Sequence, residues 1–215
     1  MKDLSIIMPT LNEEENVKVL INILNRLYKE AEILVVDSGS KDKTKDAALK
    51  LNAKVVETGK GLCRAVLEGI KKAKNNFIVV MDADLQHPPE LVKEIYENLK
   101  YNDIVIGTRF NREDYGDLSL VRYFLSRIAN FTARKFLNIK VNDPMSGFFG
   151  IKRDLAKKIN EEKCVKEGYK VLFDILKQFN NIKIKEVRYK FQIRKIGESK
   201  LSLKHAIFLI KSFIK

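Results

Sequence analysis

The chain has 215 residues, 45% of them hydrophobic, with four Pro and ten Gly. This length and composition fit one globular domain with a sizeable core and exclude an intrinsically disordered chain. The formal net charge is +13, and residues 183–215 carry ten Lys or Arg against two Glu, which predicts an anionic partner near the C-terminus. No stretch approaches the roughly 20 apolar residues that span a bilayer, so any membrane contact is expected to be peripheral.

The first residues, Met1-Lys2-Asp3, lead into a short apolar stretch with neither a basic leader nor a small-residue cleavage site. We therefore expect no signal peptide and a cytosolic protein. Cys63 and Cys164 match no metal-binding or redox spacing. We expect two free, partly buried thiols and no disulfide.

The first half of the chain alternates short apolar runs with helical periodicity. The runs at 5–8, 33–36, 54–56, 77–81 and 104–106 predict strands. Helices are predicted between them over 17–27, around 47–49, over 62–73 and after Pro88-Pro89-Glu90, where Pro suits a first turn. Strands that alternate with helices predict a parallel α/β sheet with right-handed crossovers.

Beyond Thr108 this alternation ends. The pattern predicts a long helix over 118–137, helical stretches near 153–159 and 169–179, a strand over 182–191 and a short amphipathic C-terminal helix over 203–214. No repeat or low-complexity linker divides the chain, so we expect one domain.

Polar residues follow three predicted strands at their carboxyl ends. The segment 9–15 follows the first strand, Asp37 the second, and Asp82 and Asp84 the fourth. Each acid alone is better explained as a helix cap or a solvated loop residue. Because ligands of open parallel sheets bind at this edge, their shared position favours a site. An Asp-x-Asp pair there suits a hard divalent cation and, through it, a diphosphate.

Other phosphate chemistries fit less well. The chain has no Gly-x-Gly-x-x-Gly after the first strand and no Gly-x-x-x-x-Gly-Lys-Ser/Thr, which excludes dinucleotide-binding and P-loop motifs. A phosphohydrolase would carry its nucleophilic Asp on the strand that opens the fold, whereas Asp82 and Asp84 follow the fourth.

Six segments in order, which span nearly the whole chain, carry a family resemblance. They are 7–13 (IMPTLNE), 35–40 (VVDSGS), 81–90 (MDADLQHPPE), 107–110 (GTRF), 143–149 (DPMSGFF) and 191–200 (FQIRKIGESK). Together they resemble the inverting family-2 glycosyltransferases with the GT-A fold, and most closely the dolichyl-phosphate mannose synthases. The resemblance implies a Rossmann-like α/β fold, with a mostly parallel sheet flanked by helices. It also implies a catalytic domain over 1–202, with a nucleotide-sugar half over 1–110 and an acceptor half over 111–202. The remaining residues, 203–215, alternate Lys with apolar residues, which predicts an amphipathic membrane-interface tail or, equally, a helix packed on the sheet.

The resemblance further implies roles for individual residues. Asp82, Asp84 and Gln86 would hold Mg²⁺ or Mn²⁺ on the donor diphosphate, with Ala83 between the two acids, in agreement with an all-oxygen site. The other residues implied for the nucleotide sugar are Pro9, Leu11, Glu13, Val35 and Asp37 around base and ribose, and Arg109, Arg194 and Lys200 at phosphate groups. Asp84, Arg109, Arg194 and Lys200 are the implied catalytic residues, and Arg122 and Ser126 would bind the acceptor phosphate.

The implied reaction moves mannose from GDP-mannose to dolichyl or polyprenyl phosphate, at the cytoplasmic face of the membrane. Relatives continue into transmembrane helices or use a separate membrane anchor subunit. A phosphate acceptor with a second pKa near ~6 needs no catalytic base, so His87 is expected to be a structural neighbour of the Pro-Pro turn. The donor alternatives are UDP-glucose and UDP-N-acetylglucosamine. The alternative from another class is a polyanion-binding module without catalysis, which leaves the acidic strand ends unexplained.

Several apolar segments could either pack in the core or contact substrate or lipid. Phe148 and Phe149 are expected to pack in the core, and Gly147 to let the backbone approach the substrate. The apolar stripe along 118–137 suits the core by default. However, the Arg and Lys residues of 112–135 crowd the same region, which favours contact with a lipid headgroup and its apolar tail. No nucleic-acid partner is expected, because no RNA-binding signature occurs.

Overall fold

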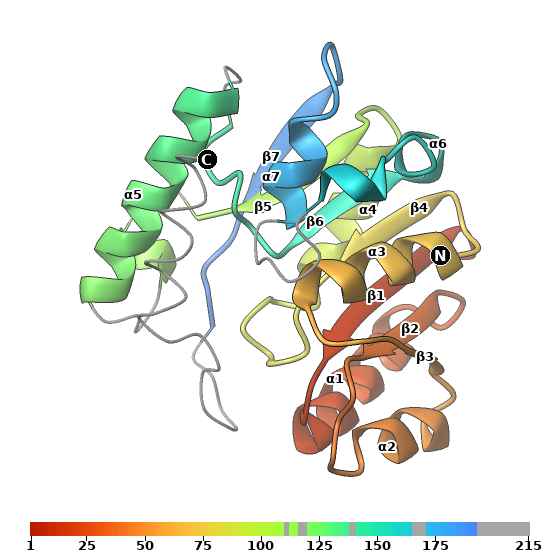
Figure 1. The fold of residues 1–215 in the computed structure, drawn as a ribbon. Coiled ribbons are helices and arrows are strands. Elements are labelled where there is room, and N and C mark those ends of the chain that lie inside the picture. Colours follow the sequence, from red (N-terminus) through yellow and green to blue (C-terminus); the bar gives the residue numbers. More distant parts are fainter. Residues whose placement is uncertain (110–111, 116–119, 138–140, 165–170, 193–215) are drawn as a thin grey trace.

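A computed structural model describes residues 1–109, 112–115, 120–137, 141–164 and 171–192 (Figure 1). The strands are β1 (Leu4–Thr10), β2 (Glu32–Asp37), β3 (Lys54–Glu57), β4 (Phe77–Val80), β5 (Ile104–Thr108), β6 (Phe149–Lys152) and β7 (Ile184–Arg188). The α-helices are α1 (Glu14–Leu27), α2 (Thr44–Lys50), α3 (Leu62–Lys72), α4 (Leu91–Leu99), α5 (Leu120–Leu137), α6 (Arg153–Ala156) and α7 (Val171–Leu176), with 3₁₀ turns η1 (Arg112–Tyr115) and η2 (Glu161–Lys163). The predicted C-terminal helix and the tail 203–215 lie outside the described residues.

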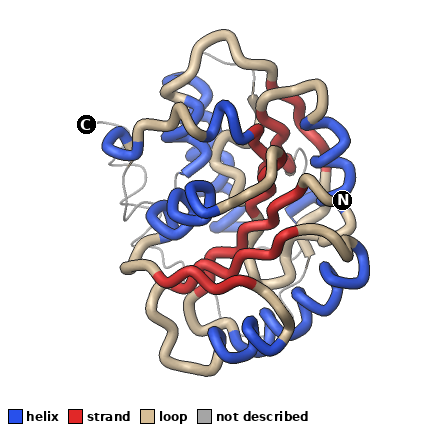
Figure 2. The backbone as a smooth tube through the Cα atoms, turned by 90° about the vertical axis from the view of Figure 1, so that its right-hand side faces the viewer, coloured by secondary structure: helices blue, strands red, loops and turns tan. Residues whose placement is uncertain are grey.

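The strands form one sheet in the order β3-β2-β1-β4-β6-β5-β7. All neighbouring pairs are parallel except those of β6, which runs antiparallel to both β4 and β5. The predicted α/β class and mostly parallel sheet are therefore confirmed. Helices cover both faces of this sheet (Figures 1 and 2).

Strand residues alternate between two hydrophobic cores, one on each face of the sheet. On β1, Ile6 and Met8 pack in the core covered by α1 and α4, whereas Ile7 packs in the core covered by α3, α6 and α7. Because successive side chains of a strand point to opposite faces, a sheet covered on both sides needs apolar residues at nearly every position. This explains why the predicted strands appear as continuous apolar runs.

The antiparallel strand β6 is absent from the sequence prediction. It has four residues, and its first three are buried, so neither length nor alternation marks it. Gly150 of β6 has no Cβ, and a Cβ at this position would lie 2.6 Å from Ile95 Cγ2 and 2.7 Å from Leu99 Cδ1 of α4. Gly150 therefore lets α4 approach the sheet closely. Phe148 and Phe149 are fully buried, which confirms their predicted packing role.

Three further expectations can be compared with the structure. The strand predicted over 182–191 is shorter, since β7 covers 184–188, and the helix predicted over 169–179 corresponds to α7 at 171–176. Cys63 and Cys164 are free and buried, as predicted. Among the described helices, none is long and apolar enough to cross a membrane.

Candidate functional site

The acidic strand ends identified in the sequence lie at one edge of the sheet. β1 pairs in parallel with β2 on one side and with β4 on the other. Thr10, the last residue of β1, lies opposite Asp37, the last residue of β2. Beyond β4 the chain continues along β1 to Met81, whose N–H donates to Ile7 O at 3.0 Å. Asp82 and Asp84 therefore emerge next to the loops that follow β1 and β2, where open sheets bind ligands.

The loop after β2 is shaped by the carboxylate of Asp37, which is fully buried. Its Oδ2 accepts the N–H groups of Gly39 at 3.0 Å and Ser40 at 2.9 Å. Gly39 adopts φ +89°, which favours glycine. The structure thus gives Asp37 a loop-forming role, and its contact with ribose stays a prediction.

The loop after β1 is joined to the loop after β2 by hydrogen bonds. Asn12 donates its N–H to Ser40 Oγ at 2.8 Å, and its Oδ1 accepts from Lys41 N at 2.7 Å. Glu13 donates its N–H to Thr44 Oγ1 at 2.9 Å. The two loops therefore form one polar rim beside the Asp-x-Asp pair.

The remaining residues predicted around the base differ in exposure. Leu11 and Glu13 are half-buried, whereas Pro9 is buried. Val35 is fully buried in the core on the α1 face. The side chain of Val35 therefore makes packing contacts, and its expected role beside the base stays a prediction.

The Asp82–Gln86 loop turns sharply. Leu85 adopts φ +63°, which is rare for a residue with a side chain, and Gln86 N–H donates to Asp84 Oδ1 at 3.1 Å. Gln86 is held to the segment after β7, because its carbonyl accepts from Gln192 N at 2.9 Å. The side chain of Asp82 is 38% exposed, whereas Ala83 is buried.

This loop offers oxygen ligands of the kind that Mg²⁺ and Mn²⁺ prefer, namely two carboxylates and the amide of Gln86. Within the described residues, no group of three or more His, Cys, Asp or Glu could hold a metal ion. Two carboxylates and one amide suit an ion that takes its remaining ligands from water and substrate phosphates, as Mg²⁺ commonly does. An added Cβ at Gly147 would lie 3.1 Å from Asp82 Oδ2, so this glycine leaves room for the carboxylate.

Arg109 directly follows β5 and is held by residues from two other segments. Its Nε donates to Asp143 Oδ2 at 2.8 Å, and Asn130 Nδ2 of α5 donates to Asp143 Oδ1 at 3.0 Å. Asp143 is fully buried, and the Arg109 side chain is 13% exposed. The guanidinium also lies 5.3 Å from the ring centroid of Phe191. These contacts fix one cation at the same edge of the sheet as the acidic pair.

His87 is buried beneath the Asp82–Gln86 loop and is 2% exposed. Burial, and to a lesser degree the positive charge of Arg109, lower the pKa of His87 to about 3. The imidazole is therefore neutral at physiological pH. Its position agrees with the predicted structural role.

The remaining predicted site residues belong to α5 or follow residue 192. Arg194 and Lys200 lie outside the described residues. Arg122 and Ser126 belong to α5, where Ser126 is half-buried, but the side chain of Arg122 lies outside the description. The residues that the sequence did not single out are Asp143 and Asn130, which hold Arg109. The Asp143-Pro144 dipeptide was visible in a motif, but its pairing with Arg109 depends on tertiary structure.

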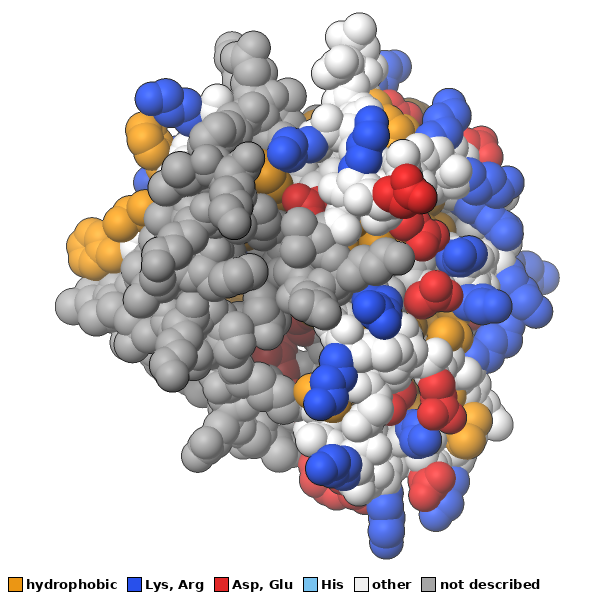
Figure 3. All heavy atoms as spheres, viewed as in Figure 1, with side chains coloured by type: hydrophobic (Ala, Val, Ile, Leu, Met, Phe, Trp, Pro, Cys, Tyr) orange, Lys and Arg blue, Asp and Glu red, His pale blue; other side chains and the backbone are white. Residues whose placement is uncertain are grey.

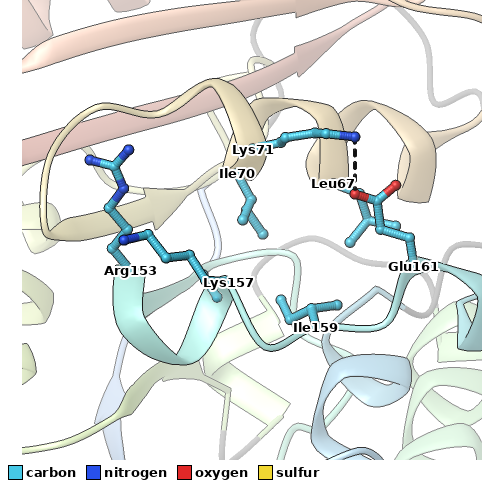
Figure 4. A pocket seen from close by; sticks show the side chains of 8 residues that line it. Leu67, Ile70, Lys71, Arg153, Lys157, Ile159 and Glu161 are labelled. Atoms are coloured by element: carbon cyan, nitrogen blue, oxygen red, sulfur yellow. Dashed lines mark ion pairs between the residues drawn. The ribbon is translucent and has the colours of Figure 1, made fainter.

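A cavity of about 270 Å³ lies elsewhere, between α3 and the α6–η2 segment (Figure 4). Leu67, Ile70 and Ile159 form apolar lining, and Lys71 pairs with Glu161 at 3.5 Å. None of the residues predicted for the site is among the eight that line this cavity. A cavity of about 20 Å³ does border Asp82, together with Ser146 and Gly147.

Solved structures define the class of this fold. Glucosyl-3-phosphoglycerate synthase from Mycobacterium tuberculosis, in complex with Mn²⁺, UDP-glucose and phosphoglyceric acid, superposes with a TM-score of 0.77. The alignment covers 99% of this chain and 77% of that chain at 21% identity. The fold is thus that of the GT-A glycosyltransferases.

The sequence comparisons define the family. Residues 5–160 match the model of glycosyl transferase family 2. The dolichol-phosphate mannosyltransferase of Pyrococcus furiosus is 36% identical over 92% of this chain, which spans 58% of that relative's length. That of Saccharomyces cerevisiae is 34% identical over 92% of this chain and 80% of its own length. The chain belongs to the family 2 glycosyltransferases.

Proposed function

We propose that this glycosyltransferase moves mannose from GDP-mannose to dolichyl phosphate or a related polyprenyl phosphate. The similarity to dolichol-phosphate mannosyltransferases over 92% of the chain carries this proposal. The Asp82-x-Asp84 pair after the carboxyl end of β4, beside the ends of β1 and β2, supports it, because a diphosphate donor needs charge neutralisation there. Family membership also makes the polyanion-binding alternative unnecessary.

Asp82, Asp84 and Gln86 would hold the divalent ion. When bound, Mg²⁺ or Mn²⁺ would neutralise charge on the departing diphosphate. The half-open carboxylate of Asp82 and the room left by Gly147 suit this role. Pro9, Leu11, Glu13, Val35 and Asp37 would form the nucleotide side of the site through the joined loops after β1 and β2.

Transfer forms a bond between an acceptor phosphate oxygen and the anomeric carbon, and breaks the bond from that carbon to the diphosphate of GDP. The acceptor phosphate is already anionic at neutral pH, since its second pKa is near ~6. His87 is buried and neutral, so it suits no base role. Arg109, held by Asp143, would contact a phosphate group as a fixed cation, and Arg194 and Lys200 would add charge at the same site.

The lipid part of the acceptor would lie along α5. Phe124, Ile128 and Phe131 are 59%, 50% and 63% exposed, and their spacing places them on one helix face. Apolar side chains protrude at the left of Figure 3, where Figure 1 draws α5. Arg127 and Lys135 on the same helix are exposed and suit anionic headgroups.

This exposed face supports peripheral contact of α5 with the cytoplasmic leaflet of the membrane. Ser126 and Arg122 of the same helix would then bind the acceptor phosphate. The membrane-interface tail 203–215 and a separate anchor subunit remain predictions. Binding to liposomes that contain dolichyl phosphate, compared between the full chain and a Phe131→Ser variant, tests whether α5 takes part.

The experiment for the function itself is a transfer assay with labelled donors. We expect label from GDP-mannose to reach dolichyl phosphate in the presence of Mn²⁺ or Mg²⁺, and neither UDP-glucose nor UDP-N-acetylglucosamine to replace it. Asp84→Ala should lose transfer even in excess metal, whereas the exposed-surface variant Asp154→Ala should retain it. Transfer from a UDP-sugar alone would overturn the donor, and an active Asp84→Ala protein would overturn the metal role.

A further inference from the structure

The geometry points to His87 as a positioning residue that fixes Asp82 for metal binding, through a hydrogen bond to the Asp82 main chain. This inference rests on the metal role proposed above for Asp82. It adds a residue that does not itself bind the ion and that acts through one that does.

His87 contacts both the backbone and the carboxylate of Asp82. The Asp82 N–H donates to His87 Nδ1 at 3.0 Å. Because Nδ1 accepts this bond, the proton of the neutral imidazole lies on Nε2. Nε2 is 3.8 Å from Asp82 Oδ2, so this N–H group lies close to the carboxylate.

The ring of His87 is itself immobilised by aromatic side chains from two other segments. It stacks on Phe148 with a centroid distance of 4.9 Å and an interplanar angle of 17°. It meets the edges of Tyr189 at 5.7 Å and Phe191 at 5.8 Å. Phe148 precedes β6, and Tyr189 and Phe191 follow β7, so the ring is anchored to the central sheet rather than to the loop that contains it.

Gly147 borders both the Asp82 carboxylate and the His87 ring. A Cβ added at Gly147 would lie 3.1 Å from Asp82 Oδ2 and 3.5 Å from His87 Cε1. The carboxylate therefore lies close to both the imidazole and the Gly147 backbone. Leu85, between Asp82 and His87, adopts φ +63°, a left-handed conformation that costs backbone energy for a residue with a side chain.

The same aromatic group connects the two charged parts of the site. The ring of Phe191 packs against the ring of His87. The Arg109 guanidinium lies over the same Phe191 ring, 5.3 Å from its centroid. The metal-binding loop and the fixed cation thus share one support. Groups of this kind commonly change metal affinity by 10–100-fold when they are removed.

Two substitutions separate positioning from packing. His87→Phe keeps an aromatic ring against Phe148 but has no acceptor for the Asp82 N–H. His87→Asn loses the ring but can present an amide oxygen where Nδ1 lies. If His87 positions Asp82 through the hydrogen bond, the variant that keeps an acceptor, His87→Asn, should keep its metal affinity. If His87 acts only through packing, the variant that keeps an aromatic ring, His87→Phe, should keep it instead.

The test measures free Mn²⁺ by electron paramagnetic resonance at saturating GDP, GDP affinity without metal, and the melting temperature of each full-length variant. We expect His87→Phe to weaken Mn²⁺ binding by about 10–100-fold, and His87→Asn to stay within about threefold of the unsubstituted protein while melting at a lower temperature. GDP affinity without metal should be equal in all three proteins. Normal Mn²⁺ binding by His87→Phe, or Mn²⁺ affinity that follows the melting temperature, would overturn the inference. Absence of Mn²⁺–GDP binding in the unsubstituted protein would instead overturn the proposed function.

Discussion

The ion pair between Arg109 and Asp143 links three segments of the chain, and its removal should be measurable as lost stability. Asp143 is fully buried and accepts from Arg109 Nε at 2.8 Å and Asn130 Nδ2 at 3.0 Å. Asp143→Ala removes the acceptor and leaves the guanidinium, 13% exposed, without this counter-charge. Breaking a buried ion pair on one side commonly costs about 3–5 kcal/mol.

We expect a value of about 3 kcal/mol, at the low end of that range, because Arg109 lies at the edge of the sheet and keeps its contact with Phe191. For a domain of about 150–250 residues, 1 kcal/mol corresponds to about 2–4 °C in melting temperature. Asp143→Ala should therefore melt about 6–12 °C below the unsubstituted protein.

Thermal unfolding followed by circular dichroism measures this difference. The matched control is Asp154→Ala, which removes an exposed carboxylate at the start of α6 and should cost less than about 0.5 kcal/mol. If Asp143→Ala melts within about 2 °C of that control, the pair contributes little, and the reasoning about its buried charges is wrong.

Three further predictions concern other parts of the fold. Gly69→Ala gains about 1 kcal/mol of helix propensity, but its Cβ would lie 2.5 Å from Ile7 Cγ2. Because overpacking costs about 1–3 kcal/mol, the variant should be less stable than the unsubstituted protein in urea unfolding. Increased stability would contradict the close packing of α3 on β1. Although burial raises the pKa of Glu32, hydrogen bonds from Lys54, Ser5 and the Lys74 N–H outweigh it and lower that pKa. Glu32 therefore stabilises the fold above its unfolded-state pKa of about 4.3, and this stability is lost as the pH falls through the lower folded-state pKa. Glu32→Gln should thus unfold more easily than the unsubstituted protein at pH 7, with a difference that shrinks in acid, whereas a constant difference would contradict the ionised role. The buried Tyr189 hydroxyl forms no hydrogen bond of normal geometry among the described residues. Burial raises the pKa of Tyr189, and Ser146 lies near enough to lower that pKa slightly against this larger effect. Tyr189→Phe should therefore leave stability unchanged or raise it by up to about 1 kcal/mol; a marked loss on thermal unfolding would show that the contact with Ser146 contributes to stability.

Local patterns were enough to predict the elements that carry the acidic residues. Strands β1 to β5 follow from apolar runs between polar segments, helices α1 and α3 from helical spacing, and α4 from the Pro-Pro-Glu start that precedes it. The position of Asp82 and Asp84 at a ligand-binding edge also followed, since residues directly after parallel strands must emerge at the carboxyl edge of the sheet.

Local patterns failed where one segment depends on a distant one. β6 is a four-residue strand with no period of its own, and it becomes a strand only because β4 and β5 leave a place between them. The shorter β7 differs from its prediction for a related reason, since its bounds depend on pairing with β5 and not on composition.

The sequence by itself determined the α/β class, the family resemblance and the residues of the metal-binding loop, because these depend on residues close together in the chain. Only the tertiary structure decided what holds those residues in place. Arg109 meets Asp143 across 34 positions and Asn130 reaches Asp143 from α5, while His87 is fixed by rings that precede β6 and follow β7. Such contacts depend on strand order and register, and these are set by burial over the whole sheet and not by any single segment.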